Sequence, residues 1–298
     1  MFIINQHYHC LVKGKHCSFY IFLSFLFLTF TGCNQGQTDE DLSSPPEYNL
    51  NSPAVIKLPG YLDEISGIAY YPKDKTVFGI SDEKGWLYKI FLSGKMNIQK
   101  WKFAKKNDFE DVVLVDSTFY ILKSTGDLLS LKFYSHDSIT VKNYKLPLTE
   151  KNEFEILYLD KEQHRLILLC KQCKADDNNS LSAWAFDLSA LTFSSSPVYV
   201  IDVRKIESLM QEKKVRFKPS AAAIHPLTGR LFIISAINKV LVVAHPNGNP
   251  EKIYRINPRL YKQPEGITFT PEGHLLVSNE SKDIGAANIL IFKYNQGK

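Results

Sequence analysis

Short acidic or hydroxylated clusters open an apolar run at five places along the chain. With Glu64, Glu110, Glu155, Ser220 and Glu265 as the anchors of these clusters, the steps between them are 46, 45, 65 and 45 residues. A period near 45 residues in a strand-rich sequence is typical of propeller blades of four strands each. We therefore predict an all-β fold, a β-propeller in which equivalent positions of every blade meet at one central channel.

The apolar runs predict five four-stranded blades, with six blades as the alternative. The 65-residue step contains an insertion, residues 204–214, in which Ile206, Leu209 and Met210 have the spacing of one amphipathic helix. The last unit offers only three strands. We expect residues 54–58 to supply its fourth strand by pairing with residues 289–294, because such a closure removes exposed sheet edges.

Each anchor is followed 13 to 17 residues later by the end of a second apolar run. Two runs with a turn between them predict an antiparallel hairpin, which brings the start of the first strand and the end of the second to one sheet edge. The alternative is that these polar strand ends only face solvent. We predict that the run ends and one anchor, Ser220, bind a ligand. This set comprises Asp82, Glu83, Ser124, Lys171, Ser220, Ser235, Asn279 and Glu280.

Four of the anchors are carboxylates, which a propeller would bring to one channel mouth. Carboxylates close together repel, and their pKa values rise unless a cation lies among them. Clusters of oxygen ligands favour Ca²⁺ or Mg²⁺ over softer metals. The alternative is a hydrated acidic funnel without a bound ion. Neutralisation of a neighbouring acid such as Glu155 by Lys171 would favour this alternative locally. We predict a calcium site formed by Glu64, Glu110, Glu155 and Glu265.

Residues 1–32 have the order of a lipoprotein signal peptide. Two lysines precede an apolar stretch, residues 18–30, that is shorter than the roughly 20 apolar residues needed to span a bilayer. The following Thr31-Gly32-Cys33 resembles the end of a lipobox, although Phe30 stands where leucine is usual. We expect acyl chains such as palmitate on Cys33 to anchor the protein in the membrane of the cell envelope, as an outer-membrane lipoprotein. A non-lipidated secretory signal and an uncleaved anchor are the alternatives.

The remainder of the chain divides into a tether and one domain. Residues 33–52 are polar and proline-containing, which predicts a flexible tether. Residues 53–298 have a length that an all-β domain can reach undivided. Removing Lys13 and Lys15 with the signal takes the formal charge from +5 to +3. This charge is too mild to indicate a nucleic-acid partner, and no nucleic-acid motif stands out. We expect the protein to be a monomer.

Cys170 and Cys173 form a lone CxxC pair. Two cysteines are too few for a structural zinc site, which needs four ligands. The βαβ context of a redox motif is also missing. A disulfide, which an oxidising compartment permits, and a pair of plain thiols both remain compatible with the sequence.

The order of these short motifs resembles the SdiA-regulated family of bacterial propeller proteins over residues 54–295. The motifs that carry the resemblance are Glu64–Ala69, Ser81–Gly85, Asp108–Asp111, Lys123–Gly126, Phe217–Ser220 and Pro264–Ile267. The resemblance implies a β-propeller in the cell envelope with a calcium-binding region at one channel mouth, and it supplies no established reaction. Asp111 and Ile156 stand where the family commonly has glycine after the acid, and Ser220 replaces an acid.

Two classes of function agree with these patterns. The first is an envelope binding protein that holds a cation and a small ligand or protein partner at the channel mouth. The second is a calcium-dependent hydrolase of phosphate esters or lactones, by analogy with other propellers. No nucleophile elbow, zinc-protease motif, phosphate-binding loop or dinucleotide fingerprint occurs in the chain. We therefore favour binding over catalysis.

Overall fold

The computed structural model describes residues 42–135, 138–281 and 286–296. The predicted signal peptide, and with it Cys33, lies outside these residues. No helix in the described part of the chain combines the length and apolar character needed to cross a membrane.

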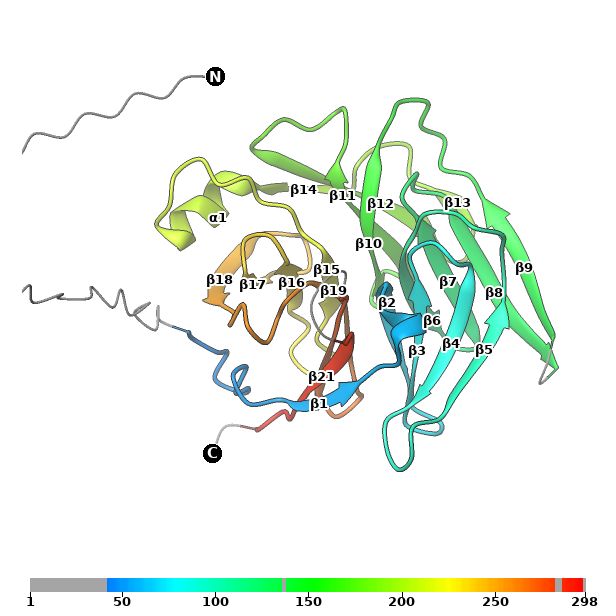
Figure 1. Cartoon of the computed structure of the whole chain (residues 1–298). Helices are drawn as coiled ribbons and strands as arrows, with labels where there is room; N and C mark the ends of the chain where they lie inside the picture. Colours follow the sequence, from blue (N-terminus) through cyan, green and yellow to red (C-terminus); the bar gives the residue numbers. More distant parts are fainter. Residues whose placement is uncertain (1–41, 136–137, 282–285, 297–298) are drawn as a thin grey trace, which may run out of the picture. The chain divides into compact units, whose positions relative to one another are not determined.

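The described chain forms five antiparallel sheets, each built around four strands (Figure 1). Grouped by blade, the strands are β2 (Ile65–Tyr71), β3 (Thr76–Ser81), β4 (Trp86–Phe91) and β5 (Ile98–Lys102); β6 (Phe109–Val115), β7 (Thr118–Lys123), β8 (Leu128–Ser135) and β9 (Ser138–Tyr144); β10 (Glu153–Asp160), β11 (Arg165–Gln172), β12 (Ser180–Asp187), β13 (Thr192–Phe193) and β14 (Tyr199–Asp202); β15 (Ala221–Ile224), β16 (Leu231–Ser235), β17 (Val240–Ala244) and β18 (Pro250–Arg255); and β19 (Pro264–Phe269), β20 (Leu275–Asn279), β21 (Asn288–Phe292) and β1 (Ala54–Lys57). The prediction of five blades is confirmed.

The first strand of each blade lies innermost, and these strands form a closed ring. Strand β2 contacts β6, and contacts then follow between β6 and β10, β10 and β15, β15 and β19, and β19 and β2. Ring closure is the property of a propeller that places equivalent residues of different blades near one axis. The beginnings of these five strands therefore define one place in the molecule where distant parts of the sequence meet.

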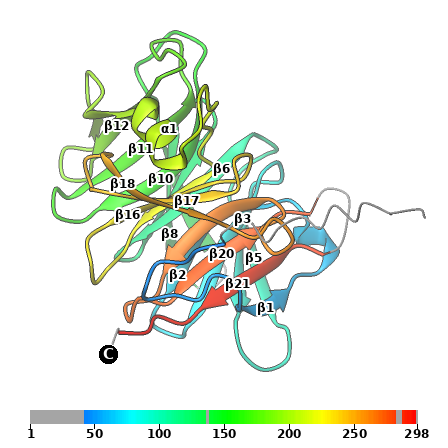
Figure 2. The same ribbon diagram turned by 90° about the vertical axis from the view of Figure 1, so that its left-hand side faces the viewer.

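The predicted closure strand is also confirmed. Strand β1 pairs antiparallel with β21, with Ala54 opposite Ile291 and Lys57 opposite Asn288. Figure 2 shows β1 and β21 side by side at the outer edge of the last blade. A short 3₁₀ turn, η1 (Gly60–Leu62), then leads from β1 of the last blade to β2 of the first.

Five apolar clusters hold the blades together, one at each interface between neighbours. The cluster between the first two blades, for example, joins Phe78 and Leu87 to Phe109 and Ile121. Clusters of the same kind lie between the second and third, third and fourth, fourth and fifth, and fifth and first blades. Burial of apolar area on both faces of each sheet is the main stabilising contribution, at about 25 cal/mol per Å².

The insertion before the fourth blade forms the predicted helix, α1 (Val203–Met210). The carboxylate of Asp202 caps it by accepting a hydrogen bond of 3.0 Å from the backbone N–H of Arg204. Ile206 is buried, and the helix packs against β18 of the next blade. The third blade also carries an extra short strand, β13, beside β14 on the outer edge of β12.

Part of the expected tether packs on the propeller. Tyr48 and Leu50 are buried in the cluster between the fourth and fifth blades, and the Tyr48 hydroxyl donates to the carbonyl of Gly273. The backbone N–H of Asn295 donates to the carbonyl of Glu47 at 2.9 Å. Contact with the propeller therefore begins before residue 53, because an aromatic side chain and a leucine anchor this segment.

Candidate functional site

A β-bulge recurs at the start of the innermost hairpin in several blades. In β6 the pairing passes from Phe109 to Asp111 and leaves Glu110 as the extra residue. The same shift leaves Glu155 extra in β10 and Glu265 extra in β19. A bulge turns the direction of a side chain and is common beside functional sites. Three glutamates from three blades are thus presented at equivalent positions.

The bulge of the first blade identifies Ser66, rather than Glu64, as the equivalent residue. Ile65 lies opposite Ser81 at the end of β3, as Phe109 lies opposite Lys123 at the end of β7, and the register of the first blade shifts just after Ile65. The choice of Glu64 as an equivalent anchor was therefore wrong by two positions. The equivalent positions are Ser66, Glu110, Glu155, Ser220 and Glu265.

The two serines of this set carry no charge, and their hydroxyls donate hydrogen bonds to backbone carbonyls. The Ser66 hydroxyl donates to the carbonyl of Glu110 in the next blade. The Ser220 hydroxyl donates to the carbonyl of Pro264, also in the next blade, at 2.7 Å. Both serine side chains are buried. The serines therefore link blades, and the charged positions are confined to the other three.

Asp111, the residue after the bulge in β6, packs against Gly67, the corresponding residue of the first blade. A Cβ added to Gly67 of the first blade would lie 2.1 Å from Asp111 Oδ1, so only glycine fits opposite this side chain. Asp111 Oδ2 accepts a hydrogen bond of 2.9 Å from the backbone N–H of Leu157 in the third blade. Burial raises the pKa of the Asp111 carboxyl well above its usual range. Asp111 is thus a structural group that connects three blades.

One side of the site is an acid triad formed by Asp82, Asp108 and Glu110. Oxygen atoms of these three carboxylates all lie within 4.8 Å of one another. The backbone holds them together, because the N–H of Phe109 donates to the carbonyl of Asp82 at 2.8 Å. Asp108 was not among the predicted ligands, although its position two residues before an anchor marks it as part of the same turn.

The other side is a lysine pocket of about 360 Å³ between the third, fourth and fifth blades. Its charged and polar lining consists of Glu155, Lys171, Lys218, Ser220, Lys262, Gln263 and Glu265. The ammonium of Lys171 forms an ion pair with Glu155 and lies 3.2 Å from a carboxylate oxygen of Glu153. The expected neutralisation of Glu155 by Lys171 is therefore present in the structure.

The ring glutamates interact electrostatically across both sides. Burial, reinforced by the carboxylate of Glu155, raises the pKa of Glu110 to about 9. Burial and the same neighbour raise the pKa of Glu265 to about 8. Burial also raises the pKa of Glu155, although Lys171 opposes the shift. Glu110 and Glu265 therefore retain protons near neutral pH unless a cation compensates their charge.

Two of the predicted ligand residues, Glu64 and Glu83, have their carboxylates in surface ion pairs. Glu64 is 3.4 Å from the ammonium of Lys84, and both side chains are more than one-third exposed. Glu83 pairs with Lys106 at the surface. Ion pairs of this exposure contribute about 0–1 kcal/mol. Neither glutamate has the burial that distinguishes Glu110 from an ordinary surface acid.

The remaining predicted residues line the hairpin ends. The backbone N–H of Asp82 donates to Glu64, and that of Glu280 donates to Gln263, so the expected strand ends do lie together. Gln263 also donates to the Glu280 carboxylate at 2.5 Å. The Asn279 amide donates to Leu260 and Asn288, Ser235 donates to Lys218, and the N–H of Ser124 donates to Asp108.

The acid triad fits a hard cation better than the lysine pocket does. It presents carboxylate oxygens from two neighbouring blades, which are the ligands that calcium takes in proteins. The ammonium of Lys171 supplies positive charge to the lysine pocket, where a cation would compete with it. A cation bound at the triad would lower the raised pKa of Glu110, because it favours the ionised carboxylate.

Comparisons with known proteins identify the family and the fold. The family model described as SdiA-regulated matches residues 43–282. A search of curated proteins finds no match. Among solved structures, glutaminyl cyclase from Myxococcus xanthus is similar with a TM-score of 0.53 and 10% identity, over 80% of this chain and 97% of that chain. At this identity the likeness concerns the fold alone.

A second solved structure, virginiamycin B lyase from Staphylococcus aureus, has a TM-score of 0.46 and 12% identity, over 82% of this chain and 89% of that chain. This likeness is too distant to carry an argument about chemistry.

Proposed function

The chain belongs to the SdiA-regulated family, and we propose that it is an envelope-anchored binding protein that holds a divalent cation, calcium, at the acid triad and a small ligand in the adjoining lysine pocket. The observation that carries this proposal is the approach of Asp82, Asp108 and Glu110 to within 4.8 Å of one another. Carboxylates at this separation repel one another when they are ionised, and a cation among them favours the ionised forms.

The protonation of the site supports a cation rather than a structural role. A carboxyl with a pKa of about 9, as at Glu110, stays neutral at pH 7 in the cation-free protein. Calcium requires the carboxylate form, so its binding releases protons and becomes tighter as pH rises. Glu110 would be the central ligand, with Asp82 and Asp108 completing the protein side of a coordination shell that calcium fills with further oxygens and water.

The lysine pocket has the size and the groups to orient a small molecule. Its volume of about 360 Å³ lies at the lower end of the range for ligand sites. Three lysines line it together with Glu155 and Glu265. We propose that its ligand carries an anionic group that meets these lysines.

Calcium stabilisation of the cation-free protein tests the proposal. A ligand that binds only the folded state raises stability by RT ln(1 + [L]/Kd), or about 2.7 kcal/mol at 100 Kd. We expect calcium to raise the thermal midpoint of the wild type and to raise it much less in Glu110→Gln. Glu64→Gln is the matched control, because it removes an acid of the same type outside the triad. Equal responses of the two variants would contradict the assignment, and a wild type insensitive to millimolar calcium would refute cation binding.

Anchoring to the envelope rests on Cys33 and has its own test. We expect Cys33→Ala to move the protein from the membrane fraction to the soluble fraction, because acyl chains contribute about 0.8 kcal/mol per buried methylene. Metabolic labelling with a palmitate analogue should mark the wild type and leave Cys33→Ala unmarked. Membrane association that persists in the variant would contradict lipidation at this residue.

A further inference from the structure

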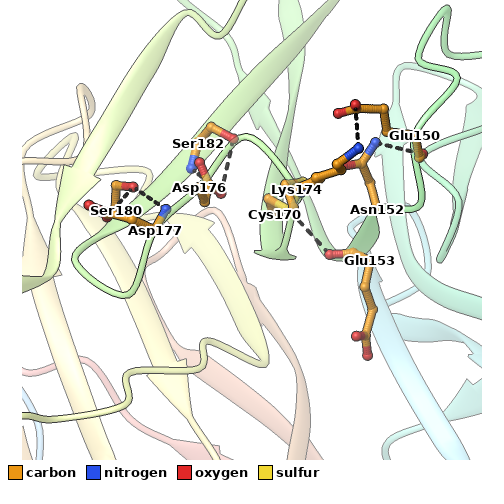
Figure 3. Close-up of a disulfide and its surroundings, with 10 residues drawn as sticks. Glu150, Asn152, Glu153, Cys170, Lys174, Asp176, Asp177, Ser180 and Ser182 are labelled. Carbon is orange, nitrogen blue, oxygen red and sulfur yellow. Dashed lines mark hydrogen bonds and ion pairs between the residues drawn. A yellow bond between two sulfur atoms is a disulfide. The ribbon is translucent and has the colours of Figure 1, made fainter.

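Cys170 and Cys173 form a disulfide that closes a four-residue turn at the end of β11, with a Cα–Cα separation of 5.9 Å. Figure 3 shows this bond and the polar residues around it. Cys170 is fully buried, and Cys173 is 6% exposed. The question left open by the sequence, disulfide or plain thiols, is answered by this bond. The turn that it closes contains Lys171, the counter-ion of the acid site.

Lys171 has no partner of its own in the sheet, although the residues on both sides of it are paired. Glu153 lies opposite Gln172 and Phe154 lies opposite Cys170, so the pairing of β10 with β11 passes over Lys171. A residue left out of the ladder in this way has no regular strand partner to set its direction. The covalent bond across the turn and the ion pairs with Glu155 and Glu153 are the contacts that direct Lys171 toward the acid site.

The surroundings of the disulfide accommodate both of its redox states. Cys173 lines a second pocket of about 360 Å³ and Cys170 does not, although both cysteines belong to the apolar cluster between the second and third blades. The Sγ atom of Cys170 lies 3.4 Å from the carbonyl oxygen of Glu153, which can accept a hydrogen bond from a reduced thiol (Figure 3). Lys174 beside Cys173 pairs with Glu150 at 2.9 Å and keeps positive charge near the turn.

We propose that the Cys170–Cys173 bond is a reversible thiol-exchange centre whose oxidised state holds the Lys171 ammonium against Glu155 and whose reduction releases it. A thiolate of a dithiol attacks Sγ of Cys173, and the electron pair of the broken bond passes to Sγ of Cys170, which takes up a proton. The second thiol of the reagent then displaces Cys173. The protein gains two thiols, and the dithiol becomes a disulfide.

The release of Lys171 would change the acid site. With its ammonium held in place, Lys171 supplies part of the positive charge that Glu155 and its neighbours require. Without it, the site retains its carboxylates and binds an external cation more tightly. This consequence rests on the proposed function, whereas the redox centre itself does not.

The amine reactivity of Lys171 tests the redox centre without any metal. The folded, calcium-free protein is treated with an acetylating reagent with and without dithiothreitol, and the modification of each lysine is followed by peptide mass spectrometry. We expect Lys171 to react about fivefold faster after reduction, because it loses its ion pair. Lys89 is the internal control, because it pairs with Asp74 in the first blade and its side chain is similarly buried.

Three results would overturn the proposal: no free thiols after treatment of the folded protein, an unchanged rate at Lys171, or the same acceleration at Lys89. In the double variant Cys170→Ser/Cys173→Ser, Lys171 should react as fast as in the reduced wild type, with or without dithiothreitol. If this variant does not fold, the comparison of the oxidised and reduced wild type decides. Calcium titration of both redox forms then separates the two ideas. Reduction should tighten binding about fivefold, whereas a redox effect at Lys171 with no calcium binding in either form would support the redox centre and refute the proposed function.

Discussion

The acid triad and the lysine pocket are built from the same bulge and differ in their counter-ion. Glu110 and Glu155 occupy equivalent positions of neighbouring blades, and both are largely buried. Glu155 has the ammonium of Lys171 from its own hairpin, whereas the corresponding strand end of the second blade offers Ser124. The difference teaches that one residue at the end of the second strand decides whether a ring carboxylate has a counter-ion in its own hairpin.

The largest expected effect comes from removing the central acid of the triad. Glu110→Gln should weaken calcium binding by on the order of 30-fold, which corresponds to about 2 kcal/mol, because an amide oxygen replaces a carboxylate at the centre of the site. Isothermal titration would measure the loss. Glu155→Gln is the comparison, since its carboxylate is already paired, and we expect a smaller effect there. A larger loss at Glu155 than at Glu110 would place the cation in the lysine pocket instead.

Removal of the Lys171 ammonium should leave Glu155 uncompensated, as Glu110 is in the wild type, and should tighten calcium binding. Lys171→Met retains the aliphatic stem but leaves Glu155 without its ammonium. We expect calcium to bind about fivefold to tenfold more tightly and the cation-free variant to be less stable than the wild type, because the remaining carboxylates repel. Lys174→Met, beside the same turn but paired with Glu150, is the matched control. If both variants behave alike, Lys171 has no special role.

The two sides should also differ in their pH dependence. The folded-state pKa values of Glu110, about 9, and Glu265, about 8, lie above the ordinary value of 4.5. Below pH 4.5 the folded and unfolded chains are both protonated at these groups, and their contribution to stability is fully present. As pH rises toward 9 the unfolded chain binds fewer protons than the folded chain, so the free energy of unfolding falls.

Urea unfolding at pH 5, 7 and 9 in the presence of a chelator would measure this slope. Calcium should restore most of the lost stability at pH 9 and little at pH 5. Glu110→Gln should flatten the slope, since it removes the group with the larger shift. A cation-free protein that gains stability over the same range would contradict the assigned pKa directions.

The smallest expected change in stability is at Glu64. Its comparison with Ser66 tests which residue of the first blade is equivalent to Glu110. Glu64→Gln removes an exposed ion pair with Lys84 and should change the free energy of unfolding by less than about 0.5 kcal/mol. Ser66→Ala removes a buried hydroxyl that donates to Glu110, and about 1 kcal/mol of stability should be lost with it. Thermal unfolding compares the two variants. A larger loss at Glu64 would favour the register first inferred from the sequence.

Much of the fold could be predicted because its signals are local. Each apolar run and its turn specify a hairpin, and the recurrence of hairpins near every 45 residues indicates blades. The helix in residues 204–214 follows from the spacing of its apolar residues, and the pairing of β1 with β21 follows from the missing strand of the last unit. The grouping of the acids was predicted less well, since the carboxylate of Glu64 pairs with Lys84 and that of Asp108 lies with those of Asp82 and Glu110.

The sequence by itself thus determined the number of blades, the closure of the ring and three of its glutamates, Glu110, Glu155 and Glu265. Only the tertiary structure decided which residue of the first blade is equivalent to them, because strand side chains alternate with a period of two and a bulge shifts that alternation by one residue. It also decided which carboxylates are compensated. The ion pair of Lys171 with Glu155, and the approach of Asp82 to Glu110, depend on contacts between strand ends and blades that are separated in sequence.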